Sequence, residues 1–148
     1  MSLLRLRRFD RLDLGACAPW FDDAETARWV PAPDDEWLAY VSDADGGAVA
    51  EVATLGDMPV ALLQYDIEGD GGVSLMITVD PARRGQGVGR EVLEAFLERA
   101  AGRFDHADAY VAEENTAALA LVRRCRFRPL AKDADGFTRF RRTLREAP

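Results

Sequence analysis

A glycine-rich loop between a strand-like and a helix-like segment constrains this chain of 148 residues more than any other feature. Residues 73–79 are β-branched and largely apolar, and residues 88–101 place their apolar side chains on one stripe of a helix. Glycine takes every second position of the loop between them: Gly85, Gly87 and Gly89. The first N–H groups of a helix have no partner within it, and the helix dipole adds partial positive charge there. The loop therefore predicts a phosphate or pyrophosphate site.

The residues around the glycines distinguish three kinds of phosphate loop. A Walker A loop needs Lys and then Ser or Thr after its last glycine, whereas Gly89 is followed by Arg90 and Glu91. A Rossmann fingerprint needs a further glycine three residues after Gly87, where Arg90 stands. The third pattern, Arg/Gln-x-x-Gly-x-Gly/Ala, is matched in full by Arg84-Gly85-Gln86-Gly87-Val88-Gly89.

Seven segments have the alternation or β-branched composition of strands: 4–7, 48–55, 60–67, 73–79, 107–112, 127–131 and 137–143. Short turns join the second, third and fourth of them into an antiparallel meander. Residues 10–40, interrupted by prolines, predict short helical pieces, and 116–124 predicts a helix capped by Asn115 or Thr116. We expect one domain over residues 1–148 with an α/β (α+β) fold: a mixed, mostly antiparallel central sheet of six to seven strands flanked by helices.

The loop and a second motif together resemble the GCN5-related N-acetyltransferase (GNAT) family. Residues 115–127 are similar to the family's Asn-x-x-Ala-x-x-Leu-Tyr-x-Lys-x-Gly-Phe, with matches at Asn115, Ala118, Leu121 and Phe127 and with Arg124 in place of Lys. The resemblance implies that the loop binds the pyrophosphate of acetyl-coenzyme A and that the strand before it offers backbone groups to pantetheine. The implied cofactor-binding residues are Ile77, Val79, Arg84, Gly85, Gln86, Gly87, Val88, Gly89, Arg90 and Asn115.

Two residues depart from the family pattern. Val122 stands where the family has the Tyr often assigned to protonate the leaving thiolate, and Arg126 stands where Gly precedes Phe127. The implied reaction is direct attack of an amine on the thioester, which needs a donor for the developing oxyanion and an acceptor for the ammonium proton. By resemblance, the oxyanion donor is a backbone N–H at a strand bulge near Met76 or Ile77.

No single proton acceptor stands out. Tyr110 occupies a position where some family members have a catalytic Glu, and Glu68 and Glu113 lie at strand ends. Asp66 and Glu114, also at strand ends, are further candidates for proton transfer, and we select Tyr110, Glu68 and Glu113 as the catalytic residues. Each is also compatible with a plain structural role, as a solvated charge or, for Tyr110, as a half-buried aromatic. A thiol with a pKa of ~8.5 leaves with little help, so water or Tyr110 can supply its proton.

Composition limits the partners. The formal net charge of −7 opposes binding to nucleic acid and favours a cationic acceptor. The sequence has no run of about 18 apolar residues, so no membrane span is predicted. With His106 as its one histidine, the sequence does not predict a metal site of the usual Cys/His composition. Its two cysteines, Cys17 and Cys125, do not predict a disulfide framework. No secretory signal is evident, so we expect a cytoplasmic protein; whether it forms a homodimer is left open.

We therefore expect an acetyl-CoA-dependent N-acetyltransferase that acts on a primary amine of a small molecule or peptide. The alternative, motivated by Val122, is a coenzyme A-binding regulatory module that keeps the fold without the transfer. A third reading is a nucleotide-binding protein that uses the same loop. Among the remaining residues, His106 is expected at a strand start and Cys125 in the core. Four arginines are expected on a solvated face of the closing strand: Arg139, Arg141, Arg142 and Arg145.

Overall fold

The strand-like segments form one mixed sheet in the computed structural model, which describes residues 3–144. Within that range the sheet has seven strands in the order β1-β2-β3-β4-β5-β7-β6. The strands are β1 (Leu4–Arg8), β2 (Ala48–Leu55), β3 (Met58–Ile67), β4 (Gly72–Val79), β5 (His106–Ala112), β6 (Arg128–Lys132) and β7 (Phe137–Thr143). Every neighbouring pair is antiparallel except β4 and β5, which are parallel. The predicted fold class is confirmed.

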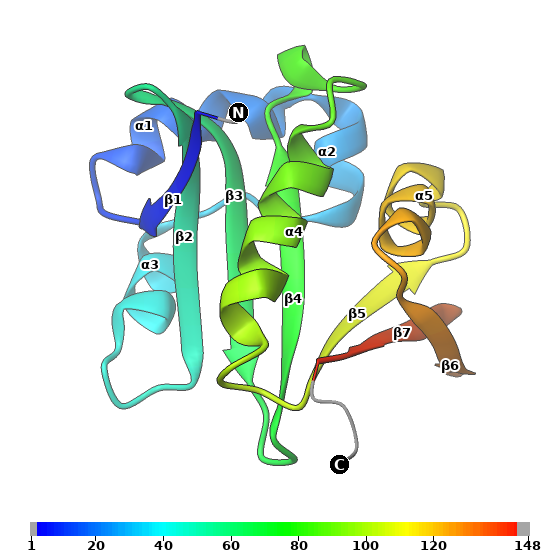
Figure 1. Cartoon of the computed structure of the whole chain (residues 1–148). Helices are drawn as coiled ribbons and strands as arrows, with labels where there is room; N and C mark the ends of the chain where they lie inside the picture. Colours follow the sequence, from blue (N-terminus) through cyan, green and yellow to red (C-terminus); the bar gives the residue numbers. More distant parts are fainter. Residues whose placement is uncertain (1–2, 145–148) are drawn as a thin grey trace.

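Helices lie against the sheet on both faces (Figure 1). They are α1 (Asp13–Cys17), α2 (Ala24–Trp29), α3 (Asp35–Ser42), α4 (Val88–Ala100) and α5 (Thr116–Arg124), with short 3₁₀ turns η1 (Ala18–Asp22) and η2 (Pro81–Arg83). The predicted helical pieces of 10–40 are α1, η1, α2 and most of α3. Aspartates begin two of them, since the side chains of Asp23 and Asp34 accept the N–H groups of Thr26 and Trp37. None of these helices is long and apolar enough to cross a membrane, within residues 3–144.

Two apolar cores follow from the alternation of side chains along the strands. On one face, α4 packs its buried stripe over the sheet, and this core includes Leu63, Tyr65, Leu93 and Phe96. On the other face, the helical segment before β2 covers Val52 and Leu62 with a core that includes Trp20, Phe21, Leu38 and Val41. The N-terminal helices therefore shield only the part of the second face that β2 and β3 provide.

The parallel pair opens almost as soon as it forms. Pairing of β4 with β5 covers Gly72–Ser74 against His106–Asp108 and no further residues of the described chain. Beyond that joint β5 diverges from β4 (Figure 1). The joint is tight because a Cβ atom at Gly72 would lie 2.1 Å from Cε1 of His106, so only glycine fits against the imidazole ring. His106 begins β5, as predicted.

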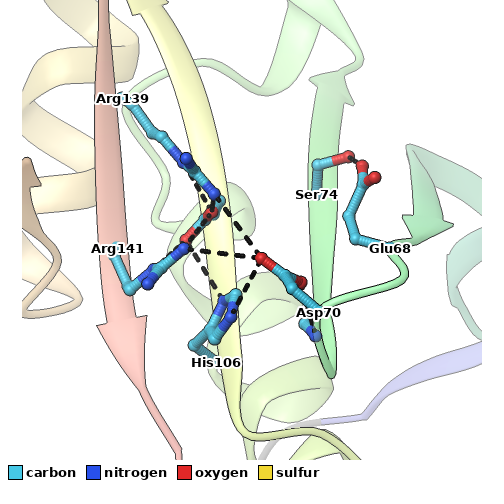
Figure 2. Close-up of polar contacts among 8 residues, drawn as sticks. Glu68, Asp70, Ser74, His106, Arg139 and Arg141 are labelled. Atoms are coloured by element: carbon cyan, nitrogen blue, oxygen red, sulfur yellow. Dashed lines mark hydrogen bonds and ion pairs between the residues drawn. The ribbon is translucent and has the colours of Figure 1, made fainter. Parts of the chain in front are cut away.

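A buried carboxylate fastens β5 to β7 beside this joint. Asp108 is 2% exposed and accepts hydrogen bonds from Nε of Arg139 and Nε of Arg141, both at 2.8 Å. Figure 2 shows these two arginines and His106 directed toward Asp70, at 3.9 Å from each guanidinium and 3.5 Å from the ring. The expectation of a solvated arginine face is wrong for Arg139 and Arg141, because their register places them opposite Tyr110 and Asp108 on one side of the sheet.

Two other arginines of the expected solvated set have different outcomes. Arg142 is partly buried, and its guanidinium donates to the carbonyl oxygen of Cys125 at 2.7 Å, so it too is not simply solvated. Arg145 lies outside the described residues. Cys125 is 2% exposed, which confirms its predicted place in the core.

The strand bulge expected near Met76 or Ile77 is absent. The register of β3 and β4 is continuous from Ala61 opposite Val79 to Ile67 opposite Val73. The opening comes instead from the end of β4–β5 pairing at Ser74. Arg126, at the family's glycine position, has φ +65° just after α5, which explains why a glycine is favoured there.

Candidate functional site

Two adjoining cavities occupy the opening between β4 and β5. The larger, about 670 Å³, runs from the Arg84–Arg90 loop between β4 and α5, and we call it the glycine-loop cleft. The smaller, about 380 Å³, lies on the other side of Ile77 and we call it the aromatic pocket, after Trp29, Tyr110 and Phe137 in its wall. Ile77, Asn115 and Leu121 line both cavities. A ligand that follows β4 can therefore extend from one into the other.

The glycine loop adopts the conformation that an anion cradle requires. Gly85 and Gly87 have φ of +75° and +80°, and Gly87 is the N-cap of α4. Neither glycine has an atom that a Cβ would meet within 4 Å, so the approach to their backbone is open. Gly89 packs against Leu121 and Val79, each 3.5 Å from its would-be Cβ. Gln86 is exposed at the loop tip and is not part of the cleft wall.

The two arginines of the loop are already engaged by acidic residues. Arg84 donates to the carboxylate of Asp23 and, at 2.9 Å, to the hydroxyl of Thr26. The hydrogen bond from Arg84 holds the pKa of Asp23 at about 2 and raises the pKa of Arg84. Arg90 donates to Glu94 at 3.0 Å one turn along α4. Both arginines nevertheless line the glycine-loop cleft, so each adds positive charge to its wall.

The backbone of β4 provides the long wall of the cleft. Hydrogen bonds from Glu68 N to Gly72 O and from Asp80 N to Val60 O, both 2.9 Å, mark bonded residue pairs at the two ends of the β3–β4 ladder. Because bonded pairs alternate in an antiparallel ladder, Met76 directs its N–H and C=O toward β3. The N–H and C=O of Leu75, Ile77 and Val79 point the other way, into the opening. Of the two residues considered for an oxyanion donor, the structure thus presents Ile77 and not Met76.

Asn115 stands at the start of α5, where the two cavities meet. Its side-chain oxygen accepts the N–H of Ala118 at 3.2 Å and caps the helix. Its amide NH₂ group is not needed for that cap, so it can still donate to a ligand. The capping role and the predicted ligand contact are therefore compatible.

Tyr110 is the one of the three catalytic candidates that lines a cavity. Its side chain is 53% exposed in the aromatic pocket, which Val122 also lines from α5. The Arg139 guanidinium lies 5.8 Å from the centre of its ring. Ala109 and Val111 of β5 pack in the same core as Val122, so the alternation of side chains directs Tyr110 to the other face of the sheet. Tyr110 and Val122 therefore line the aromatic pocket from different sides.

Glu68 and Glu113 lie outside the walls of both cavities. Glu68 accepts a hydrogen bond from Ser74 at 2.8 Å across the β3–β4 turn (Figure 2). Glu113 is exposed and pairs with Lys132 at 3.2 Å. Glu114, the further carboxylate after β5, is also exposed and lines neither cavity. These positions supply no direct contact with a group bound in the opening.

A polar network that the sequence reading did not identify joins α3 to β3. Asp66, a further candidate for proton transfer in the sequence, lines the aromatic pocket together with Gln64. Trp37 Nε1 donates to Gln64, and the Tyr40 hydroxyl donates to Asp66. A signal was present, because two polar residues on the same side interrupt an otherwise apolar strand. Their partners on α3 were not evident before the fold was known.

No group of three or more His, Cys, Asp or Glu side chains within residues 3–144 is arranged to hold a metal ion.

Comparison with known proteins places these features in context. The model of the acetyltransferase (GNAT) family matches residues 14–127. A mycothiol acetyltransferase from Clavibacter michiganensis subsp. michiganensis is 33% identical over 130 residues, which are 87% of this chain and 35% of that protein. The chain thus spans about a third of the length of this curated relative.

Solved structures share the fold at low sequence identity. A spermidine N-acetyltransferase from Vibrio cholerae in complex with CoA and spermine superposes with a TM-score of 0.82 at 17% identity, covering 96% of each chain. An aminoglycoside acetyltransferase in complex with coenzyme A and kanamycin has a TM-score of 0.80 at 17% identity, covering 95% of this chain and 94% of that one.

Proposed function

This chain belongs to the acetyltransferase (GNAT) family, and we propose that it transfers the acetyl group of acetyl-coenzyme A to a primary amine. The observation that carries the proposal is that the backbone groups of Leu75, Ile77 and Val79 on β4 face an opening continuous with the glycine loop. A pyrophosphate at the N-terminus of α4 and an extended amide chain along β4 fit this arrangement. The two solved acetyltransferase structures with the same fold contain CoA with spermine and coenzyme A with kanamycin, which supports the proposed cofactor and an amine acceptor.

Different residues of the chain bind different parts of the cofactor. The backbone N–H groups of Gly85, Gly87 and Gly89 and the charges of Arg84 and Arg90 serve the pyrophosphate, with Val88 and Gln86 completing the loop. The backbones of Ile77 and Val79 pair with the amides of pantetheine as a strand would. Asn115 donates at the point where the thioester passes into the aromatic pocket.

The transfer step needs positioning more than strong acid or base catalysis. The amine nitrogen forms a bond to the thioester carbonyl carbon, the Ile77 N–H donates to the carbonyl oxygen as it becomes negative, and the carbon–sulfur bond then breaks. Tyr110 donates a proton to the leaving thiolate, and the ammonium proton passes to water. The roles of Glu68 and Glu113 as direct proton acceptors remain predictions that their distance from the cavities does not favour.

Two measurements test the function. Thermal unfolding with equal concentrations of acetyl-CoA, ATP and NAD identifies the ligand of the loop, and acetyl-CoA is expected to give the largest rise in melting temperature. Release of free thiol from acetyl-CoA over a panel of amines then tests transfer. Greater stabilisation by ATP or NAD would overturn the proposal. Stabilisation by CoA with no amine-dependent thiol release would favour the regulatory module that Val122 suggests.

The proposal extends to the compartment, the acceptor and the oligomeric state of the protein. We place it in the cytoplasm, because Cys17 and Cys125 are both buried free thiols, as expected for a reducing compartment. The acceptor is a cationic small-molecule or peptide amine, drawn to an acidic protein. A homodimer stays a prediction that light scattering on the purified chain can check.

A further inference from the structure

We infer that Asp66 binds a second, non-reacting cationic group of the acceptor, so that the preferred acceptor is an amine with two positive centres. The inference rests on the proposed acetyl transfer and adds to it the feature by which acceptors are selected. The supporting observations are the hydrogen bonds that hold Asp66, the absence of a cation beside it, and its place along the cavity.

Asp66 is held from two sides by neutral donors. The Tyr40 hydroxyl donates to its Oδ2, and Gln64 Nε2 donates to its Oδ1 at 3.0 Å. Gln64 is itself oriented by Trp37 Nε1, which donates to its side-chain oxygen at 2.8 Å. Trp37 and Tyr40 lie three residues apart on one side of α3, so a helix outside the sheet fixes the direction of a carboxylate on β3. The bond to Asp66 raises the pKa of Tyr40, which keeps the phenol protonated as a donor.

The negative charge of Asp66 has no cationic partner among the residues that the structure describes. Asp66 takes part in no ion pair among residues 3–144, whereas the more deeply buried acids Asp13, Glu51 and Asp108 each bind an arginine. A carboxylate has about four lone-pair directions, of which two neutral donors occupy two. Asp66 therefore retains both charge and acceptor capacity on the wall of the aromatic pocket.

The position of Asp66 separates an anchoring role from a role in proton transfer. Asp66 is opposite Ser74 in the β3–β4 register, and Ile77, which faces the thioester, lies three residues further along β4. Three residues of strand span about 10 Å. That length is too great for Asp66 to take the proton of an amine attacking at Ile77. It suits a second ammonium group on the same acceptor, with an apolar linker against Met76 and Phe137.

The neighbouring carboxylates do not offer the same contact. Glu68 accepts from Ser74, and Asp70 lies among Arg139, Arg141 and His106. Neither lines the aromatic pocket, whereas Asp66 does. The selectivity of the pocket for a second charge thus depends on one side chain.

The test compares hexylamine with hexamethylenediamine, which adds a second ammonium group at the far end of the same carbon chain; having two equivalent reacting ends accounts for a factor of about two. With the wild-type chain, kcat/KM for the diamine should exceed that for the monoamine by about tenfold or more, as expected for a hydrogen bond to a charged group. Asp66→Asn should abolish that ratio while changing monoamine kcat/KM and the KM for acetyl-CoA less than threefold. Asp45→Asn, which removes an exposed acid in the turn after α3, is the matched control and should keep the ratio.

Binding of the diamine to the CoA-saturated chain, measured by calorimetry, gives a readout that does not need turnover. Diamine binding that is lost in Asp66→Asn and kept in Asp45→Asn supports the anchor even if no acetyl transfer occurs, in which case the proposed function alone fails. Transfer to both amines with no preference, an equal loss for both amines in Asp66→Asn, or no diamine binding by wild type would overturn the anchor.

Discussion

The glycine-loop cleft and the aromatic pocket share residues of α2, β4 and α5, including Ile77 and Asn115, but differ in the rest of their walls. The cleft adds the glycine loop, whose backbone N–H groups closely follow β4 in the chain. The pocket adds side chains from β3, β5 and β7, which are far apart in sequence. A common ligand can be held by backbone groups that many sequences supply, whereas a particular acceptor needs particular side chains.

The comparison also explains which parts of the site tolerate departure from the family. The cleft keeps both glycines of the pattern: Gly87 has a positive φ, and Gly89 packs closely against Leu121 and Val79. In the pocket, Val122 stands where the family pattern has Tyr, and Tyr110 lines the same cavity from β5. The role proposed for Tyr110 would place a side-chain function on another element, whereas the function proposed for the loop depends on its own backbone.

The largest expected effect is a loss of stability when Asp108, beside the β4–β5 joint, is substituted. Asp108→Asn should lower the free energy of unfolding by about 3 kcal/mol, because it leaves the partly buried guanidiniums of Arg139 and Arg141 without their shared carboxylate. Urea unfolding measures the change. Asp57→Asn, in an exposed turn, is the control and should change stability by less than about 0.5 kcal/mol. An equal effect of the two substitutions would contradict the role of the joint.

The same carboxylate predicts a pH dependence. Burial raises the pKa of Asp108, but the hydrogen bonds from Arg141 and Arg139 outweigh burial and hold it below the ordinary value. The unfolded chain therefore takes up this proton first, at about pH 4. The contribution of Asp108 is complete above that pH and is lost as the pH falls toward the lower pKa of the folded state. Stability of Asp108→Asn, followed through the same acidification, should fall less steeply; parallel curves would refute this assignment.

The next largest effect is a loss of CoA affinity when Gly87 is substituted, and a control variant distinguishes loss of backbone contacts from backbone strain. Gly87→Ala should weaken CoA binding about 100-fold, because it disturbs several N–H donors to the pyrophosphate and places a methyl group beside them. Calorimetry with CoA measures the affinity. Gly56→Ala is matched in strain, since Gly56 has φ +60° in the β2–β3 turn. It should lose comparable stability and no CoA affinity, and an equal loss of affinity would show that strain alone is responsible.

A smaller effect is expected for the phenol in the pocket. Tyr110→Phe should reduce kcat about tenfold, below the usual range for a general acid, because a thiolate leaves readily. The KM for acetyl-CoA should stay unchanged, since Tyr110 is not part of the glycine-loop cleft. Steady-state thiol release gives both constants. An unchanged kcat would mean that water protonates the thiolate, and a raised KM would move Tyr110 into cofactor binding.

The smallest effect concerns the partner of Arg84. Asp23→Asn should tighten CoA binding about threefold, because Arg84 no longer has to leave a carboxylate to meet the pyrophosphate. Asparagine also caps helices well, so α2 should persist. Asp22→Asn removes the neighbouring charge, for which no bond to Arg84 exists in the described residues, and should leave the affinity within twofold. Weaker binding by Asp23→Asn would mean that the pair positions Arg84 for its ligand.

Local patterns were sufficient for much of this molecule. The alternation of residues 48–79 predicted the meander, the stripe from Val88 predicted α4, and of the two caps considered for α5 the structure uses Asn115. The prediction of a bulge near Met76 or Ile77 was wrong, because strands can separate without an irregular strand. Here the sheet opens where the pairing of β4 with β5 ends. The arginines of β7 were assigned to solvent because Asp108, 31 residues away from Arg139, was not recognised as their partner.

The sequence by itself determined the positions that must be glycine, the caps and the two periodicities, because each depends on a backbone conformation decided within a few residues. Only the tertiary structure decided which side chains meet. Strand register sets Asp66 beside the pocket and Asp108 beside two arginines, and α3 brings Tyr40 to Asp66 across 26 residues of chain. Such contacts depend on the packing of whole elements, which no short segment encodes.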